Sequence, residues 1–405
     1  MAALAPFRAL RPASSAAARV AAVPYDVVNI NEARTLAAGN PLSFLHVSRA
    51  EIDVPEGSSP YADDVYAMAV KNFERLKTEA PLLLEDAPRV YVYRLRMGTH
   101  VQIGLAGCFS VDDYDRNVIR KHEHTRPDKE DDRTRHLLEL RAQTGPVFLT
   151  YRTRPTVDAL VERVMTAPPL YDFTAVDGVQ HTIWRVEPFE EHQIVVAFDA
   201  VPALYIADGH HRAASAARAR RHLGGATGQR GEWDWFLAVA FPDVQLQILP
   251  YNRVVQDLAG MTPDVFLSML RQRFSITDGL ASPARRGEVS MFLNGHWHTI
   301  VLSDGHMTAK SAERLDVMRL QDSVLGPLLR IGDVRTDKRI EFVGGARGTS
   351  ELESRVRSGA AAVAFSLYPV DVQDLMAITD AGGIMPPKST WFEPKLRDGL
   401  LSHLV

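Results

Sequence analysis

The sharpest change in the pattern of apolar and polar positions lies in the middle of the chain, in the stretch VPALYIADGHHRAASAARARRHLG at 201–224. The apolar run at 203–207 has the length and the Tyr and Ile content of a buried strand. After Asp208 and Gly209 the composition becomes rich in Ala and Arg, which favours a helix that ends at Gly224. The pattern therefore predicts a strand that turns at a glycine directly into a helix.

Similar patterns predict alternating helices and strands along the rest of the chain. Helical periodicity predicts helices at 31–39, 61–77, 157–165, 187–194, 262–274, 316–329 and 370–379. Apolar or alternating runs predict strands at 21–28, 42–47, 89–95, 101–111, 182–186, 233–241, 244–249 and 360–369, and a hairpin at 290–302 around Asn294 and Gly295. This order predicts a mixed α/β (α+β) fold.

The predicted turn at Asp208 and Gly209 has the features of an anion site. A helix that opens directly after a strand presents unpaired N–H groups and the positive end of its dipole. His210, His211 and Arg212 fall in the first turn, where cationic side chains oppose that dipole, so their presence suggests a ligand. The alternative is that Asp208 only caps the helix and that one histidine belongs to the core.

A second cluster of chemistry-bearing residues lies at 120–141, which mixes acidic, basic and histidine side chains. A solvated helix face with ion pairs is one interpretation, and a helix that lines an anion and metal site is the other. His122, Glu123 and His124 do not form the HExxH zinc motif, and cysteine ligands for structural zinc are lacking. Oxygen ligands for a hard cation are available, as Mg²⁺ prefers. They are Glu123, Asp128, Asp132 and Asp208.

Two further segments offer polar side chains. Tyr251, Asn252 and Arg253 follow a predicted strand, and binding loops gather at strand ends. Near the C-terminus, GIMPPKST lacks the glycine that a phosphate loop needs before its lysine, because Pro387 stands there, so the Walker A motif is excluded. Lys388, Ser389 and Thr390 can still reach a phosphate or polar substrate, although a purely structural closing loop is an equal alternative.

Composition narrows the classes of function. The chain has 405 residues, 24% of them charged, and a net charge of −4, which gives no basic excess for nucleic acid. Its one cysteine, Cys108, has apolar neighbours and is expected in the core, which fits a reducing compartment. Prolines at 6 and 12 argue against a targeting peptide, and no apolar run is long enough for a membrane helix. We expect a cytoplasmic protein.

Several segments resemble the recurrent motifs of one family over the whole chain. They are PFRALRP at 6–12, PYDVVN at 24–29, NPLSFLHVSR at 40–49, KHEHTRPDKEDDR at 121–133, AQTGPVFLTYR at 142–152, ADGHHR at 207–212, LPYNR at 249–253 and MPPKSTWFEPK at 385–395. On these motifs the chain is similar to the DUF1015 family, and its DGHHR segment resembles the ParB/sulfiredoxin-like superfamily, which includes kinases of free serine. The resemblance implies a ParB/sulfiredoxin-like catalytic core at 1–255 and an α+β portion at 256–405.

The resemblance also implies phosphoryl transfer to free L-serine, which gives O-phospho-L-serine, with pyrophosphate, ATP or ADP as donor. The oxygen ligands make Mg²⁺ the expected cofactor. Such chemistry needs donors around phosphate oxygens, a metal and a carboxylate. Asp208 and Glu123 are the expected base and metal ligands. The expected phosphate ligands are Gly209, His210, His211, Arg212, Arg126, Arg133 and Lys388, and the expected substrate ligands are Asp26, His122, Tyr251, Asn252, Arg253, Ser389 and Thr390.

Two other functions stay open at this point. One is a ParB-like nucleotide-binding protein without turnover of small molecules, which would carry DNA-binding helices and a basic patch. The other is a metal-dependent phosphohydrolase that uses the same His and Asp residues. No nucleic-acid or membrane partner is expected, and assembly into a homodimer is allowed for.

Overall fold

The chain has the mixed α/β fold that its order of elements predicts. The computed structural model describes residues 2–79, 82–224, 230–302 and 314–405. These residues form two units, Met1–Leu246 with Pro394–Val405 and Gln247–Glu393. The sequence placed the boundary after residue 255, whereas residues 247–255 group with the second unit and 394–405 with the first.

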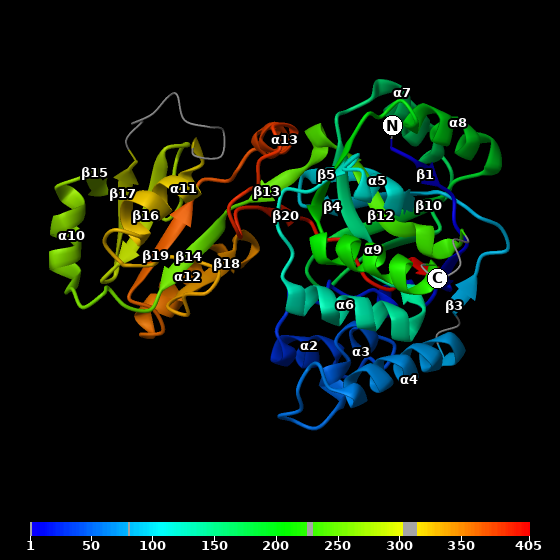
Figure 1. The fold of residues 1–405 in the computed structure, drawn as a ribbon, viewed down its shortest axis with the longest axis horizontal. Helices are drawn as coiled ribbons and strands as arrows, with labels where there is room; N and C mark the ends of the chain where they lie inside the picture. Colours follow the sequence, from blue (N-terminus) through cyan, green and yellow to red (C-terminus); the bar gives the residue numbers. More distant parts are fainter. Residues whose placement is uncertain (1, 80–81, 225–229, 303–313) are drawn as a thin grey trace. The chain divides into compact units, whose positions relative to one another are not determined.

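The first unit is built on a mixed sheet, which has nine strands among the described residues (Figure 1). The strands follow one another in space as β6 (Ile119–Arg120), β11 (Leu204–Asp208), β8 (Val147–Tyr151), β12 (Trp235–Pro242), β5 (His100–Ser110), β4 (Tyr91–Met97), β10 (Gln180–Arg185) and β9 (Tyr171–Thr174), and β1 (Leu4–Ala5) pairs with β5. β11 runs parallel to β6 and antiparallel to β8. A smaller sheet joins β3 (Leu82–Leu84), β2 (Ala9–Pro12), β21 (Ser402–Leu404) and β7 (Ala142–Gln143).

The described residues of the first unit also form helices, some packed in the core of the nine-stranded sheet and some in a second core. They are α1 (Ala17–Val20), α2 (Ile30–Ala37), α3 (Leu45–Ser48), α4 (Asp63–Glu79), α5 (Val111–Asp115), α6 (Pro127–Leu140), α7 (Pro155–Val164), α8 (Pro188–Phe198) and α9 (His210–Gly224). Small residues of α9, such as Ala213, Ala216 and Ala217, are buried in the core cluster, which lets this helix lie close to the sheet. The long helix α6 lies beside α9 (Figure 1).

The second unit has its own sheet and its own core. Its strands are ordered β15 (Ser275–Asp278), β17 (His296–Val301), β16 (Glu288–Leu293), β19 (Val363–Leu367), β14 (Tyr251–Val255) and β18 (Ile340–Gly344), and β13 (Gln247–Leu249) pairs with β20 (Trp391–Glu393). Its helices are α10 (Pro263–Arg271), α11 (Asp316–Leu320), which a π-helical turn continues, α12 (Gly348–Arg357) and α13 (Val372–Asp380).

Two of the predicted strands are wrong. The segment 21–28 contains a turn instead, in which Val27 N–H bonds the carbonyl of Pro24. The run 42–47 leads into α3, because the side chains of Asn40 and Ser43 accept hydrogen bonds from backbone N–H groups two residues later and so bend the chain into a helical turn. Local side-chain bonding has overruled the apolar pattern there.

Two observations concern the general class of the protein. Within the described ranges, the longest apolar helices fall short of what a membrane crossing requires. The thiol of Cys108 is buried in the core of the first unit, and this burial raises its pKa well above the ordinary value. Cys108 is therefore a core residue, as its apolar neighbours predict.

Candidate active site

The junction of β11 and α9 has the predicted strand–glycine–helix form. A register shift between Ile206 and Asp208 interrupts the pairing of β11 with β8, which turns the end of the strand. Gly209 follows with φ of +91°, a conformation that a residue with a side chain rarely adopts. A Cβ atom at Gly209 would also lie 2.9 Å from Nε of Arg212. Glycine is thus required for α9 to begin at His210.

Asp208 is held by two cations. Its Oδ2 accepts a hydrogen bond from Nζ of Lys395 at 3.0 Å and lies 3.7 Å from a guanidinium nitrogen of Arg212. Burial raises the pKa of Asp208, but the charges of Lys395 and Arg212 outweigh this effect and bring the pKa well below its ordinary value. An ionised carboxylate that already pairs with two cations is an anchor for them, and it is a weak base.

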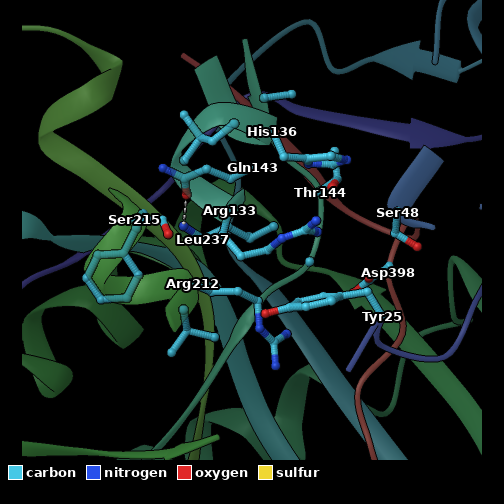
Figure 2. Close-up of a pocket in the computed structure, with 15 residues that line it drawn as sticks. Tyr25, Ser48, Arg133, His136, Gln143, Thr144, Arg212, Ser215, Leu237 and Asp398 are labelled. Carbon is cyan, nitrogen blue, oxygen red and sulfur yellow. Dashed lines mark hydrogen bonds between the residues drawn. The ribbon is translucent and has the colours of Figure 1, made fainter. Parts of the chain in front are cut away.

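A small cavity opens beside this junction, and two arginines face it (Figure 2). Arg133 of α6 is fixed by Asp132 at 2.8 Å and lies over the ring of Tyr25 at 4.1 Å. Arg212 of α9 donates to the carbonyl oxygen of Pro146 at 2.5 Å, and its buried Nε has no hydrogen-bond partner. The cavity is also lined by Ser48, His136, Leu137, Ala142, Gln143, Thr144, Gly145, Val147, Ser215, Phe236, Leu237 and Asp398.

Asp398 lines the same cavity and is only 3% exposed. Its backbone pairs with Ala22 in both directions, which brings it beside the PYD segment. Oδ1 of Asp398 is buried and has no hydrogen-bond partner in the part of the chain that the structure describes. Burial raises the pKa of Asp398 to about 7, with Arg212 opposing and Asp26 adding to the rise. A carboxyl of this kind can exchange a proton near neutral pH.

Three side chains beside the start of α9 form a different kind of group. His122 precedes α6, His210 is the first residue of α9, and their rings are 4.4 Å apart and nearly perpendicular. With Glu123 they offer ligand atoms that all lie within 4.8 Å of one another. Among the described residues this is the group able to hold a metal ion, and Asp208 is not part of it.

The other residues predicted for the first unit lie around this centre. Asp26 is exposed and interacts electrostatically with Arg212. His211 accepts a hydrogen bond at Nε2 from the backbone of Arg126 at 3.0 Å, and the side chain of Arg126 is 67% exposed and pairs with Asp128. The structure thus brings most of the predicted ligands of the first unit together, with Arg126 at the surface.

Residues predicted near LPYNR and MPPKST belong to the second unit. Tyr251, Asn252 and Arg253 follow strand β13, as expected, but the expectation that they form a loop is wrong, because they start β14, between β18 and β19. Asn252 accepts from Leu367 N–H, and Arg253 donates to the carbonyl of Lys388, so both have structural partners. Ser389 is buried and donates to Pro386, and Thr390 is half-buried. The role of these residues and of Lys388 in binding substrate stays a prediction.

Four residues of the site were missed by the sequence analysis. Lys395 ends the WFEPK motif, so the motif itself could have indicated it. Tyr25 stands inside PYDVVN, and Gly145 stands inside AQTGPVFLTYR, a neutral segment that suggested only a strand. Asp398 lies outside the motifs, and only the fold, which pairs it with Ala22, brings it to the cavity.

Comparisons with known proteins complete this description. A family model with the description "Protein of unknown function (DUF1015)" matches residues 4–318. No match was found among curated proteins. Among solved structures, the chain is similar to SbnI with C-terminal truncation from Staphylococcus aureus, with 13% identity, a TM-score of 0.39 and coverage of 72% of this chain and 85% of that one.

Two more solved structures show a similar degree of likeness. A conserved hypothetical protein from Pyrococcus furiosus has 13% identity and a TM-score of 0.36, over 74% of this chain and 95% of that one. A free serine kinase in complex with AMP has 11% identity and a TM-score of 0.38, over 73% and 92%. At these scores the likeness assigns no role to any residue of this chain.

Proposed function

The chain belongs to the DUF1015 family, whose function is unknown, and from the geometry of its site we propose that it is a phosphotransferase that phosphorylates an alcohol group of a small metabolite. Free L-serine is the acceptor that the DGHHR resemblance favours, with O-phospho-L-serine as product. Pyrophosphate, ATP or ADP is the donor. The observation that carries the proposal is that one small cavity is lined by two arginines, whose side chains are 14% and 11% exposed, and by a buried carboxyl oxygen that has no hydrogen-bond partner among the described residues.

Arg133 and Arg212 supply the positive charge that a transferring phosphoryl group needs. Guanidinium groups bind phosphate oxygens with several N–H donors at once, and held arginines lose little freedom on binding. Asp132 fixes the first, and Pro146 and Asp208 fix the second. Both arginines line the cavity, so a phosphate bound there would lie between two positive charges.

Asp398 is the base in this proposal. The acceptor hydroxyl gives its proton to Oδ1 of Asp398, and its oxygen forms the new bond to phosphorus. The bond between phosphorus and the bridging oxygen of the donor breaks, which releases phosphate from pyrophosphate, AMP from ADP or ADP from ATP. General bases work best with a pKa near the working pH, as the pKa of about 7 provides.

Magnesium, which the sequence predicts on Asp208 and Glu123 from their oxygen ligands, fits these residues poorly. Mg²⁺ in phosphate sites usually takes one or two carboxylates, waters and phosphate oxygens. Here Lys395 and Arg212 already neutralise Asp208, and Glu123 lies beside two imidazole rings. No step of the proposed reaction is therefore assigned to Mg²⁺ on this pair, and Asp208 is proposed to position Arg212 and Lys395.

The test is product formation by the purified protein with L-serine and each donor in turn, followed by ³¹P NMR. We expect O-phosphoserine with one donor and a rate that rises with pH through about 7, as Asp398 loses its proton. Asp398→Asn should abolish transfer. Arg212→Lys should lower kcat/KM about 10- to 100-fold, because it removes hydrogen bonds to a charged ligand.

Matched variants guard against a general loss of structure. Arg220→Lys lies on the same helix and alters an arginine that pairs with Asp112 and Asp234, so it should keep near wild-type activity. Full activity in Asp398→Asn would refute the base assignment. Absence of product with every donor, from protein that is folded, would refute the kinase.

A phosphohydrolase is the second candidate, and the group of His122, Glu123 and His210 is the observation that favours it. A metal ion with two imidazoles and a carboxylate can activate a water molecule for attack on phosphorus. Release of phosphate from the donor at the same rate with and without L-serine would support the hydrolase over the kinase.

A further inference from the structure

The group of His122, Glu123 and His210 has the chemistry of a metal site that the phosphotransfer proposal does not use. Its three ligand atoms lie within 4.8 Å of one another, a spacing that one ion can bridge. The two histidines come from different parts of the chain, the segment before α6 and the start of α9. The fold therefore brings the two histidines together, and their closeness does not follow from adjacency in the sequence.

His122 supplies the second, independent observation. The residue is 2% exposed, and its Nδ1 is buried without a hydrogen-bond partner. The ring of His122 also makes a hydrogen bond to the backbone of Ile206. Because Nδ1 has no partner, Nε2 donates this hydrogen bond, and the lone pair of the neutral ring lies on Nδ1. Metal-binding histidines commonly hold their second nitrogen against a backbone carbonyl in this way. An unsatisfied buried nitrogen otherwise costs free energy.

His210 is also buried, at 7% exposed. Its Nε2 accepts a hydrogen bond from the backbone N–H of His122 at 3.4 Å, a long contact that a metal ion bound at this nitrogen would replace.

We propose that His122, Glu123 and His210 bind a divalent transition-metal ion such as Zn²⁺ or Mn²⁺. Two imidazoles and one carboxylate are the ligands of catalytic zinc and of related transition-metal sites, which keep further positions open. Mg²⁺ prefers an all-oxygen shell and is disfavoured by two nitrogen ligands. The open positions would take water or an oxygen of a phosphate ligand. This site rests on its own ligands and stands whether or not the chain transfers phosphoryl groups.

The experiment measures metal binding directly. The full chain is stripped with a chelator, and Zn²⁺, Mn²⁺ and Mg²⁺ are titrated separately by calorimetry and by equilibrium dialysis with elemental analysis. We expect one equivalent of Zn²⁺ or Mn²⁺ to bind much more tightly than Mg²⁺. Co²⁺ should bind at the same site and give visible absorption bands. These bands should disappear when Zn²⁺ is added and displaces Co²⁺.

Three variants locate the ion. Glu123→Gln, His122→Ala and His210→Ala should each weaken binding on the order of 100-fold, at least as much as the loss of an outer-shell partner does. His124→Ala is the matched control, because His124 is exposed in the same segment and lies outside the group. Glu123→Gln keeps the size of a half-buried side chain and so tests the proposal even if a histidine variant does not fold.

Binding of Mg²⁺ in preference to Zn²⁺ and Mn²⁺ would overturn the proposal, as would tight binding that all three ligand variants retain. Equal losses in His124→Ala would also overturn it. None of these readouts uses phosphoryl transfer, so failure of the proposed reaction and failure of the metal site are distinguishable.

Discussion

Asp398 shows how its surroundings set the chemistry of a single carboxyl group. Arg212, Arg133 and Arg397 face it with positive charge, and Asp26 faces it with negative charge. Burial is the largest effect, and it leaves the pKa of Asp398 near 7 despite three arginines. The same burial leaves Oδ1 of Asp398 without a partner. A residue that only stabilised the fold would be expected to pair with one of these arginines.

The raised pKa of Asp398 predicts a particular dependence of stability on pH. The unfolded chain loses this proton near its ordinary pKa of about 4, whereas the folded chain keeps it until about 7. The folded state therefore binds more protons in this window, and the contribution of Asp398 to the free energy of unfolding falls as pH rises from 4 to 7. Asp398→Asn removes this dependence.

The measurement is urea denaturation of both proteins at pH 5 and at pH 8. The free energy of unfolding of Asp398→Asn, measured relative to that of wild type, should rise by about 1–3 kcal/mol between pH 5 and pH 8, since one pKa unit corresponds to about 1.4 kcal/mol. If the difference in stability between the two proteins were the same at both pH values, the raised pKa would be refuted.

Lys395 makes the complementary prediction for Asp208. Its side chain is 9% exposed, and Lys395→Met would leave the Asp208 carboxylate with the guanidinium of Arg212 at 3.7 Å and the backbone N–H of Gly209 at 2.9 Å. We expect the free energy of unfolding at pH 7 to fall by about 1.5–3 kcal/mol, the range for a hydrogen bond to a charged group. Lys77→Met, which breaks a surface pair with Glu74, should change it by less than about 1 kcal/mol. Equal effects of the two variants in chemical denaturation would contradict this prediction.

At the scale of elements, the segment between β7 and β8 is shaped to admit Asp398. A Cβ atom at Gly145 would lie 2.5 Å from Oδ1 and 3.1 Å from Cγ of Asp398. Gly399 N–H also bonds the carbonyl of Thr144, which holds the two segments together. The glycine of AQTGP thus has a steric role that its apolar neighbours do not reveal.

Gly145→Ala should push Asp398 out of place and destabilise the fold by about 1–3 kcal/mol, as overpacking does. It should also reduce phosphoryl transfer. Gly332→Ala, where no atom lies within 4 Å of the new Cβ, is the control and should be near neutral. Thermal unfolding of a double variant tests the cause, because Asp398→Ala should restore stability to Gly145→Ala. A double variant as unstable as the sum of the two single variants would show that the contact is not responsible.

The sequence predicted the helices and strands well where residue composition and turn residues favour the same structure. The apolar run of β11, the glycine after it and the Ala and Arg content of α9 all favour the same structure, and it forms. The hairpin at Asn294 and Gly295 follows from its turn chemistry in the same way. Strand β14 was missed because its partners, β18 and β19, come about ninety or more residues later. Pairing over that distance leaves no periodic trace in a short segment.

At the scale of the whole molecule, the end of the chain completes the first unit. Pro394–Val405 groups with Met1–Leu246, after the chain has formed the second unit in between. Strand β21 lies between β2 and β7, and the same terminal segment carries Lys395 and Asp398. The sequence analysis assigned these residues to the C-terminal portion, because a domain boundary predicted from sequence groups residues that are adjacent along the chain.

Truncation after Glu393 should therefore damage the first unit and spare the second. Loss of β21 separates β7 from β2 and leaves β2 paired with β3 alone in this sheet among the described residues. Loss of Lys395 and Asp398 removes a partner of Asp208 and the proposed base. In calorimetry, the transition of the first unit should move to lower temperature or vanish. Residues 247–393 have a separate core, so the transition of the second unit should remain, and the isolated fragment 247–393 identifies it. If the first unit kept its unfolding transition and the protein kept its activity without residues 394–405, two claims would be refuted. One is that β21 stabilises the first unit, and the other is that this segment takes part in catalysis.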